Sequence, residues 1–414
     1  MSERLKRILL IVLFVLFAGA TAYGLYVVFF RAAQKPTAQI PGGQNATGTL
    51  PTAGTGGPTP SGTGQGQAGT LPTTGETNAN QQPGSATPSA PLKTVLLSQS
   101  VSQQISRSSD GTGARFYNPQ DGKFYKVSVD GLITPLSDTS FSDVTNVAWG
   151  NTSDQAILAF PDGRKIHYDF TSKTQTTLPS QWDGFAFSQD DQKIVAKNNA
   201  TSPESRYLIL SDPNGKNSQA IEPLGNNQDK VTPNYTPNGQ IIAYATTGQE
   251  EGFDRQQIIL VGKNHENFAG LLVEGRGFEP IWSPSGNSVV YSIWNIANGY
   301  RPELWISGGA PGNLNQNRID LKVQTWAHKC AWENETVIVC GVPEQMPEGA
   351  GLQPSEFATL VDRIVEINTE TGYAADLGKP EGDLSVKDPV ITKDGSNFMF
   401  TDVASGRMYA FKLQ

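Results

Sequence analysis

Side chains that commonly perform acid–base or nucleophilic chemistry are sparse in this sequence. Its three histidines lie far apart in the chain: His167, His265 and His328. No Gly-x-Ser-x-Gly elbow, His-Glu-x-x-His pair or phosphate-binding loop accompanies them. The adjacent acids Asp190-Asp191 and Glu250-Glu251 are typical of solvated turns. The sequence therefore predicts no catalytic residue, no metal and no cofactor, although residues distant in the chain can still assemble a site.

The only two cysteines have a spacing that favours a bond between them. Cys330 and Cys340 flank Trp332 and the apolar run 337–339, with a turn near residues 334–335. Such a hairpin places the two side chains opposite each other, and an oxidising compartment then favours a disulfide. Two buried free thiols are the alternative. A metal site is disfavoured because zinc takes four ligands and His328 is the only further one nearby.

A repeat positions these residues from residue 92 onwards. Its clearest copy is FEPIWSPSGNSVVYSI at 278–293, in which an apolar anchor precedes a polar turn and a β-branched run. Six weaker copies accompany it. The seven anchors, about 38 to 59 residues apart, are Ile105, Trp149, Phe187, Tyr235, Trp282, Trp332 and Ile391. Repeats of this length with several short strands are typical of propeller blades.

The predicted fold is an all-β, seven-bladed β-propeller over residues 92–414. Six or eight blades stay open because the first copy, near Ile105, is degenerate. The last repeat ends one strand short at Gln414, and the segment 93–98 is free to supply that strand. Closing the ring in this way would remove an exposed sheet edge.

The Trp-Ser-Pro-x-Gly unit followed by an apolar strand resembles the propeller repeat of TolB-like proteins. Relatives of prolyl oligopeptidase carry a similar repeat in their non-catalytic domain, but no hydrolase domain follows it here. The resemblance implies an extracytoplasmic scaffold in the bacterial envelope. This chain departs from TolB because a low-complexity segment stands where TolB has a small α/β domain. The partners of TolB therefore do not carry over.

The first 91 residues predict a membrane anchor and a tether. Residues 8–30 hold no charge and are long enough to cross a bilayer as a single helix. A cleaved signal peptide, with a cleavage site at residues 20–22, is the alternative. The basic side chains of residues 1–7 favour a cytoplasmic N-terminus and a propeller outside the plasma membrane. Residues 31–91, rich in Gly, Pro, Thr, Ser and Gln, predict a disordered tether.

The distribution of charge narrows the class of partner. The chain has a formal net charge of −8 and its first 91 residues carry about +3, so the remainder carries about −11. An acidic domain of this kind is not expected to bind nucleic acid, which requires clustered Lys and Arg. Contact with the membrane is expected through residues 8–30 alone.

Long connections between the second and third strands of several repeats predict a recognition face. Loops on a rigid scaffold commonly carry binding residues, and aromatic side chains dominate binding hot spots. The candidate binding residues in these connections are Phe253, Trp294, Tyr300, Arg301 and Phe357. The expected function is a membrane-tethered scaffold that binds cell-envelope proteins or wall polymer. The alternative is an extracytoplasmic hydrolase or lyase at the mouth of the propeller channel.

A basic residue also opens the third strand of every repeat. Two interpretations stay open: a ring of cations displayed to an acidic partner, or side chains that pack along strands and pair with neighbouring acids. These residues are Lys123, Arg164, Arg206, Arg255, Arg301, Arg363 and Arg407.

Overall fold

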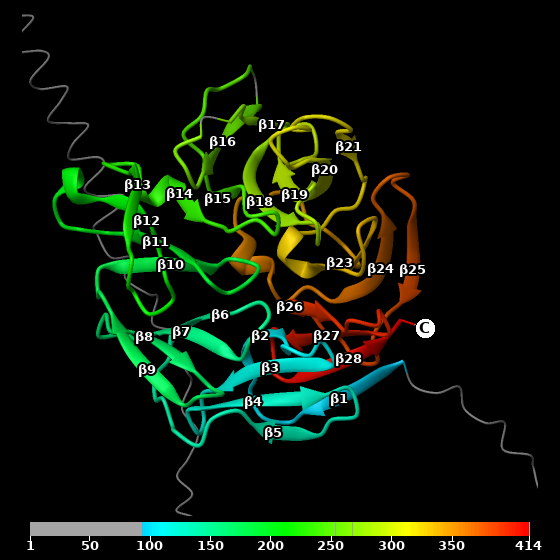
Figure 1. Cartoon of the computed structure of the whole chain (residues 1–414). Coiled ribbons are helices and arrows are strands. Elements are labelled where there is room, and N and C mark those ends of the chain that lie inside the picture. Colours follow the sequence, from blue (N-terminus) through cyan, green and yellow to red (C-terminus); the bar gives the residue numbers. More distant parts are fainter. Residues whose placement is uncertain (1–92, 253, 267, 414) are drawn as a thin grey trace, which may run out of the picture. The chain divides into compact units, whose positions relative to one another are not determined.

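A computed structural model describes residues 93–252, 254–266 and 268–413. Within them, seven four-stranded antiparallel sheets are arranged around a common axis, which confirms the predicted all-β, seven-bladed propeller (Figure 1). The predicted membrane span 8–30 and tether 31–91 lie outside the described residues. No helix within the described ranges is long and apolar enough to cross a bilayer.

The first four blades follow the chain with the innermost strand first. Blade 1 contains β2 (Gln103–Arg107), β3 (Gly113–Asn118), β4 (Lys123–Ser128) and β5 (Ile133–Pro135). Blade 2 contains β6 (Asn146–Trp149), β7 (Gln155–Ala159), β8 (Lys165–Asp169) and β9 (Thr174–Leu178). Blade 3 contains β10 (Trp182–Phe187), β11 (Ile194–Asn198), β12 (Tyr207–Ser211) and β13 (Gln219–Pro223). Blade 4 contains β14 (Val231–Pro233), β15 (Ile241–Ala245), β16 (Gln256–Gly262) and β17 (Leu271–Val273).

The last three blades complete the ring. Blade 5 contains β18 (Arg276–Trp282), β19 (Ser288–Trp294), β20 (Glu303–Gly308) and β21 (Ile319–Asp320). Blade 6 contains β22 (Cys330–Trp332), β23 (Val337–Pro343), β24 (Asp362–Asn368) and β25 (Ala374–Gly378). Blade 7 contains β26 (Val386–Ile391), β27 (Asn397–Asp402), β28 (Met408–Lys412) and, as its outermost strand, β1 (Thr94–Ser98). Short 3₁₀ helices lie between strands: η1 (Pro203–Ser205), η2 (Gln228–Lys230), η3 (Ala327–Lys329) and η4 (Pro354–Phe357).

The strand β1 joins the beginning of the propeller to its end. It pairs antiparallel with β28, with Thr94 opposite Phe411 and Val95 opposite Ala410. The backbone N–H of Lys412 also donates to the carbonyl of Lys93, at 2.7 Å. Because residues from both ends of the sequence share one sheet, the ring is closed by hydrogen bonds.

The core lies between neighbouring blades. The middle strands β19, β23 and β27 are buried along most of their length, as expected for strands covered by a sheet on each face. Val290 of blade 5, for example, packs in one cluster with Ile338 and Ile367 of blade 6. No blade buries both of its faces alone, so the blades stabilise one another around the ring.

The tight turns after the inner strands share one hydrogen-bonding pattern, which explains the Trp-Ser-Pro-x-Gly signature. In blade 5 the N–H of Ser288 donates to the Ser283 hydroxyl, 3.2 Å away, and Gly286 adopts a φ of 73°. In blade 3, Asp191 occupies the position of that glycine, with a φ of 57°. We call the end of the ring formed by these turns the turn face. The opposite end, formed by the connections between second and third strands, is the loop face.

Candidate functional site

The central channel opens at the turn face into a hollow of about 530 Å³ with a mixed polar and apolar lining. All seven blades line it. Blades 5 and 6 contribute the indoles of Trp282 and Trp332, blade 1 contributes Arg107, and blade 6 contributes Glu333 and Glu335. Burial raises the pKa of the Glu333 carboxyl, and Glu366 raises it further. The hollow contains acids and one cation, but no histidine lines it.

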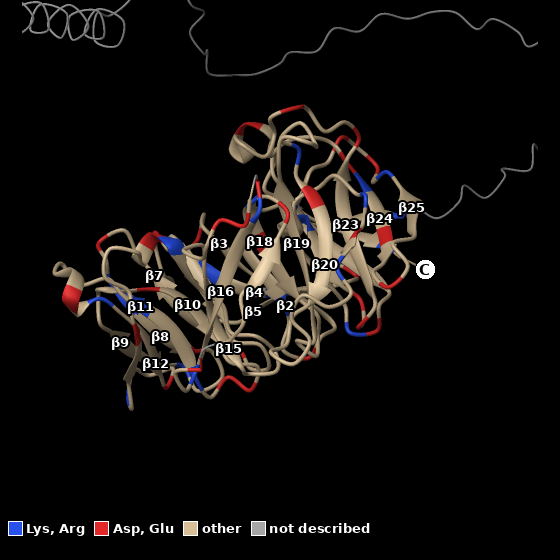
Figure 2. Ribbon diagram, turned by 90° about the horizontal axis from the view of Figure 1, so that it is seen from above, with Lys and Arg blue, Asp and Glu red and all other residues tan. Residues whose placement is uncertain are grey.

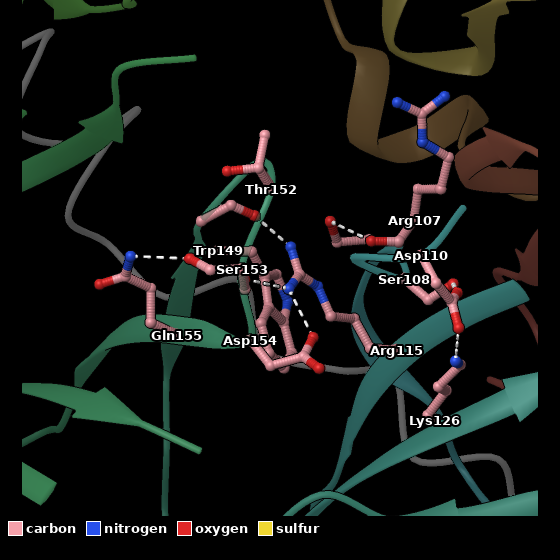
Figure 3. Close-up of polar contacts among 12 residues, drawn as sticks. Arg107, Ser108, Asp110, Arg115, Lys126, Trp149, Thr152, Ser153, Asp154 and Gln155 are labelled. Atoms are coloured by element: carbon pink, nitrogen blue, oxygen red, sulfur yellow. Dashed lines mark hydrogen bonds and ion pairs between the residues drawn. The ribbon is translucent and has the colours of Figure 1, made fainter. Parts of the chain in front are cut away.

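A buried arginine fixes the turn face beside this hollow (Figure 3). Arg115 donates through Nη1 to the carbonyl of Ser153 at 2.7 Å and to Asp154 at 3.1 Å, and through Nη2 to the carbonyl of Gly150. Its guanidinium lies over the ring of Trp149, 4.6 Å from the ring centroid. Burial lowers the pKa of Arg115, and Asp154 opposes that effect. Arg115 therefore joins blade 1 to blade 2 and is not available to a ligand.

Arg107 differs from Arg115. Its guanidinium extends away from the buried network in Figure 3, and it makes no ion pair with any residue that the structure describes. It is therefore the free cation of the turn-face hollow.

Asp191 corrects the prediction that both members of the pair Asp190-Asp191 lie in a solvated turn. Its side chain is 3% exposed, and its carboxylate accepts from the backbone N–H groups of Asn151, Thr152 and Ser153 at 2.5, 2.8 and 2.8 Å. The hydroxyls of Thr152 and Ser153 also donate to it. Asp191 is thus a buried acceptor for the turn of the preceding blade, whereas Asp190 is exposed as expected.

On the loop face, two candidate aromatic residues are in contact. The rings of Trp294 and Tyr300 lie edge to face with centroids 5.9 Å apart. A Cβ placed on Gly277 or on Gly351 would lie 2.4 Å from the Trp294 indole, so the indole is packed closely between two glycines. Trp294 therefore has a structural role, although one of its edges lines a hollow of about 350 Å³.

The loops of blades 5 and 6 around this pair are tied together. The N–H of Gly349 donates to the carbonyl of Gly299 at 2.9 Å, and that of Gly351 donates to the carbonyl of Tyr300 at 2.8 Å. Arg301 donates from Nε to the carbonyl of Met346, also at 2.9 Å. The candidate Arg301 therefore joins two loops. These two hydrogen-bonded loops together form a platform.

Two apolar side chains on this platform are exposed to solvent, and the sequence interpretation did not include them. Ile296 is 47% exposed and Leu352 is 50% exposed. Ile296 also borders a second hollow, of about 450 Å³, together with Asp254 and the ion pair Arg255–Glu274. We call the set Trp294, Ile296, Tyr300 and Leu352 the loop-face patch.

The remaining aromatic candidates are not part of this patch. Phe357 lies half-buried at the end of η4 and stacks on no aromatic ring within the described ranges. Phe253 lies outside the described residues. Other large apolar side chains that are exposed belong to β1, to the start of β5 and to the turn after β24: Val95, Leu96, Leu132, Ile133 and Tyr373.

The three histidines occupy unrelated places. His167 is half-buried in blade 2, where its Nε2 lies 2.6 Å from Gln155 Oε1 and burial lowers its pKa. His265 lies in the turn before β17. His328 of η3 is held by Glu279 of β18, with its Nδ1 2.8 and 3.0 Å from the two carboxylate oxygens.

The pair His328–Glu279 is the only contact in the described part of the chain in which a carboxylate orients a histidine. Both side chains are partly exposed, and Glu279 lines the same hollow as Trp294. The neighbouring Lys329 is buried and paired with Asp362, Nζ to Oδ2 2.7 Å. Acid–base chemistry in the hollow beside Trp294, on the loop face, would therefore depend on His328.

Cys330 and Cys340 lie directly opposite each other on β22 and β23 and form a disulfide. They pack in the core cluster between blades 5 and 6. The bond joins two strands that are already adjacent in the sheet.

The basic residues that open the third strands do not form a free ring. Arg255 pairs with Glu274 at 2.8 Å, and Arg363 pairs with Asp376. Arg164 lies over the Phe160 ring, and Arg206 donates to carbonyls of its own blade. Figure 2 shows Lys and Arg positions interspersed with Asp and Glu along the ribbon.

Comparison with known proteins identifies the fold but no family. No protein-family model and no curated protein sequence matches the chain. An oligogalacturonate lyase in complex with manganese is similar in structure, with a TM-score of 0.51 and 16% identity over 76% of this chain and 89% of the lyase. The oligogalacturonate lyase of Vibrio parahaemolyticus has a TM-score of 0.53 and 15% identity, over 77% of this chain and 91% of the lyase.

A propeller of a different kind matches equally well. The Swd1 β-propeller domain of Myceliophteria thermophila gives a TM-score of 0.52 and 10% identity over 78% of this chain and all of that domain. Identities this low define the class, a β-propeller protein, and nothing finer. One of the lyases was solved with manganese. In the part of this chain that the structure describes, no three His, Cys, Asp or Glu side chains are grouped to hold a metal ion.

Proposed function

We propose that this protein is a TolB-like binding scaffold of the bacterial cell envelope, anchored in the plasma membrane by residues 8–30. The tether 31–91 would allow the propeller to reach partners at a distance from the bilayer. The partners are envelope proteins or wall polymer. Nucleic acid is not among them, because the propeller is acidic and binding to phosphates requires clustered Lys and Arg.

The observation that carries the proposal is the loop-face patch. Large apolar side chains exposed on two hydrogen-bonded loops are typical of an interaction site rather than of a bare surface. Ile296 and Leu352 are each about half exposed, so covering the remainder of either side chain would contribute about 1 kcal/mol, roughly half the value for full burial. A partner that covers them supplies that stabilisation.

The disulfide supports placement of the propeller outside the cytoplasm. Disulfides persist in oxidising compartments and are rare in the cytosol, where thiols are kept reduced. Cys330–Cys340 agrees in this respect with the charge bias around residues 8–30. A membrane-impermeant amine reagent applied to intact cells tests the placement. We expect labelling of propeller lysines without lysis, and labelling only after lysis would contradict the proposal.

The binding role is tested by crosslinking the full-length protein in intact cells and identifying the proteins or polymer captured. The double variant I296S/L352S removes the exposed apolar surface without disturbing the packed Trp294. We expect it to lose the specific partner, whereas the equally conservative L132S, at an exposed site near β5, keeps it. Capture that is unchanged in I296S/L352S would refute the assignment of this face.

A second candidate function, an extracytoplasmic hydrolase or lyase, is favoured by one observation. A carboxylate that orients a histidine, as Glu279 does for His328, is the usual arrangement of a general base. The test is to incubate the protein with a library of acidic and neutral glycans and to detect products by mass spectrometry. Turnover that is lost in H328N and reduced in E279Q would establish an enzyme. Absence of turnover, with partner capture intact, would leave the scaffold.

A further inference from the structure

We infer that the loop-face patch binds a protein segment in which basic residues flank apolar side chains, rather than a wall polymer. This inference rests on the proposed scaffold function and names its partner class. It follows from the charges around the patch and from the kind of apolar side chain that the patch exposes.

The charge balance of the two loops is strongly one-sided. Residues 294–302 and 343–361 contain a single basic residue, Arg301, and three glutamates, Glu344, Glu348 and Glu356. Arg301 is committed to loop carbonyls, and Glu344 pairs with Lys379, Nζ to Oε2 3.4 Å. Glu348 and Glu356 are exposed and make no ion pair with a described residue.

The carboxylates lie in the same loop as the exposed apolar surface. Glu348 and Glu356 are on either side of Leu352 in the sequence, and the Glu348 side chain packs beside Gly299 of the neighbouring loop. Ile296 is bounded on its other side by Asp254, whose carboxylate accepts from the Ile296 N–H at 3.0 Å. A partner that covers the apolar residues therefore meets Glu348 and Glu356 beside Leu352 and Asp254 beside Ile296, where Arg255 is already paired with Glu274.

The exposed side chains of the patch favour a peptide over a carbohydrate. Carbohydrates bind to exposed aromatic faces bordered by hydrogen-bonding groups, but here Trp294 is packed between glycines and the most exposed groups are aliphatic. Two hollows, of about 350 and 450 Å³, border the Trp294 and Ile296 side chains. Successive apolar side chains of one peptide segment could occupy both, as in other groove-binding modes.

The test measures binding of synthetic peptides to the purified full-length protein in detergent micelles. The probe is a 16-residue peptide that alternates lysines with leucines, and the comparison peptides replace lysine by glutamate or leucine by serine. We expect saturable binding of the first peptide only. Its affinity should fall at least tenfold in I296S/L352S and at least tenfold in E348K/E356K, and it should weaken in 0.5 M NaCl because exposed charges are screened.

Matched controls separate this site from general attraction to an acidic protein. Leu132 and Glu370 are exposed elsewhere on the propeller, so L132S and E370K should change the affinity less than twofold. Equal weakening by E370K and E348K/E356K, or unchanged affinity in I296S/L352S, would overturn the inference. Unfolding midpoints of all variants should match that of the unmodified protein, since every substituted side chain is exposed.

Failure of this inference differs from failure of the scaffold function. If a crosslinker at position 352 captures a partner in cells whose contact segment is acidic or is a polysaccharide, the scaffold stands and the partner class is wrong. If that segment is basic and apolar, the inference is supported. If crosslinkers at this face capture nothing specific, both proposals are refuted.

Discussion

Replacement of Asp191 tests whether the propeller is held by contacts between successive turns. Its carboxylate accepts from the backbone N–H groups of Asn151, Thr152 and Ser153, which belong to the turn of the preceding blade. The residue also adopts a φ of 57°, which L-residues other than Asn and Asp rarely adopt. Asp191→Ala removes the acceptor and keeps the unfavourable backbone conformation.

The expected magnitude follows from these two terms. A hydrogen bond to a charged group contributes about 1.5–3 kcal/mol net, but Asn151 and Thr152 are exposed and water can replace the carboxylate there. Loss of the acceptor should therefore cost about 2 kcal/mol, and alanine in the left-handed region adds about 1 kcal/mol. We expect destabilisation by about 3 kcal/mol in D191A.

Two further variants separate the terms. D191G loses the acceptor but relieves the backbone, so it should cost about 2 kcal/mol. D191N keeps one acceptor oxygen and tolerates the backbone conformation, so it should cost about 1 kcal/mol. Urea unfolding of the purified full-length chain, followed by tryptophan fluorescence, gives the three values. If all three variants unfold within 0.5 kcal/mol of the unmodified protein, contacts between turns contribute little and the reasoning is refuted.

Three other predictions concern the same scaffold. Arg115→Lys should lower the free energy of unfolding by about 3 kcal/mol, because an ammonium cannot reproduce the buried guanidinium fork. C330S/C340S should cost about 3 kcal/mol, since the bond closes a loop with a sequence separation of 10, and a reducing agent should lower the stability of the unmodified protein equally. The Ser188 hydroxyl lowers the pKa of the Asp190 carboxyl below its ordinary 3.8. The Asp190 carboxylate therefore stabilises the fold above about pH 4, and this contribution is lost as the pH falls through the lowered pKa. D190N should therefore be less stable than the unmodified protein at pH 7, and the difference should shrink as the pH falls through the lowered pKa of Asp190.

Each of these is decided by urea unfolding of the variant beside the unmodified chain. An R115K protein of unchanged stability would show that the buried guanidinium contributes only packing. If reduction of the disulfide leaves the stability of the unmodified protein unchanged while C330S/C340S is destabilised, the cost comes from the serines and not from the lost bond. A D190N difference that is the same at pH 7 and in acid would mean that the carboxylate charge is not what stabilises the turn.

The blades could be predicted from the sequence because each repeats a local signal. A turn such as that after Trp282 needs only nearby residues: the Ser283 hydroxyl, Ser285 and the positive φ of Gly286. Seven such units fix a seven-bladed ring, and the structure has seven blades. The N-terminal anchor and tether stay predictions.

Burial of single charged side chains could not be predicted, because it depends on the adjacent blade. Asp191 resembles its neighbour Asp190 in sequence, yet a turn about 40 residues earlier in the chain buries it. Arg115 lies within an apolar strand and gives no local sign of its partners. Ile296 and Leu352 were missed for a related reason: which apolar loop residues remain exposed is decided by how the two loops pack against each other.

The most direct test of the scaffold is to place a photoreactive amino acid at position 352 of the full-length protein and irradiate intact cells. Position 132 serves as the control, since Leu132 is exposed and distant in the chain from the loop-face patch. The account predicts a specific envelope partner crosslinked from position 352 and not from position 132. Identical products from both positions, or none from 352, would contradict it.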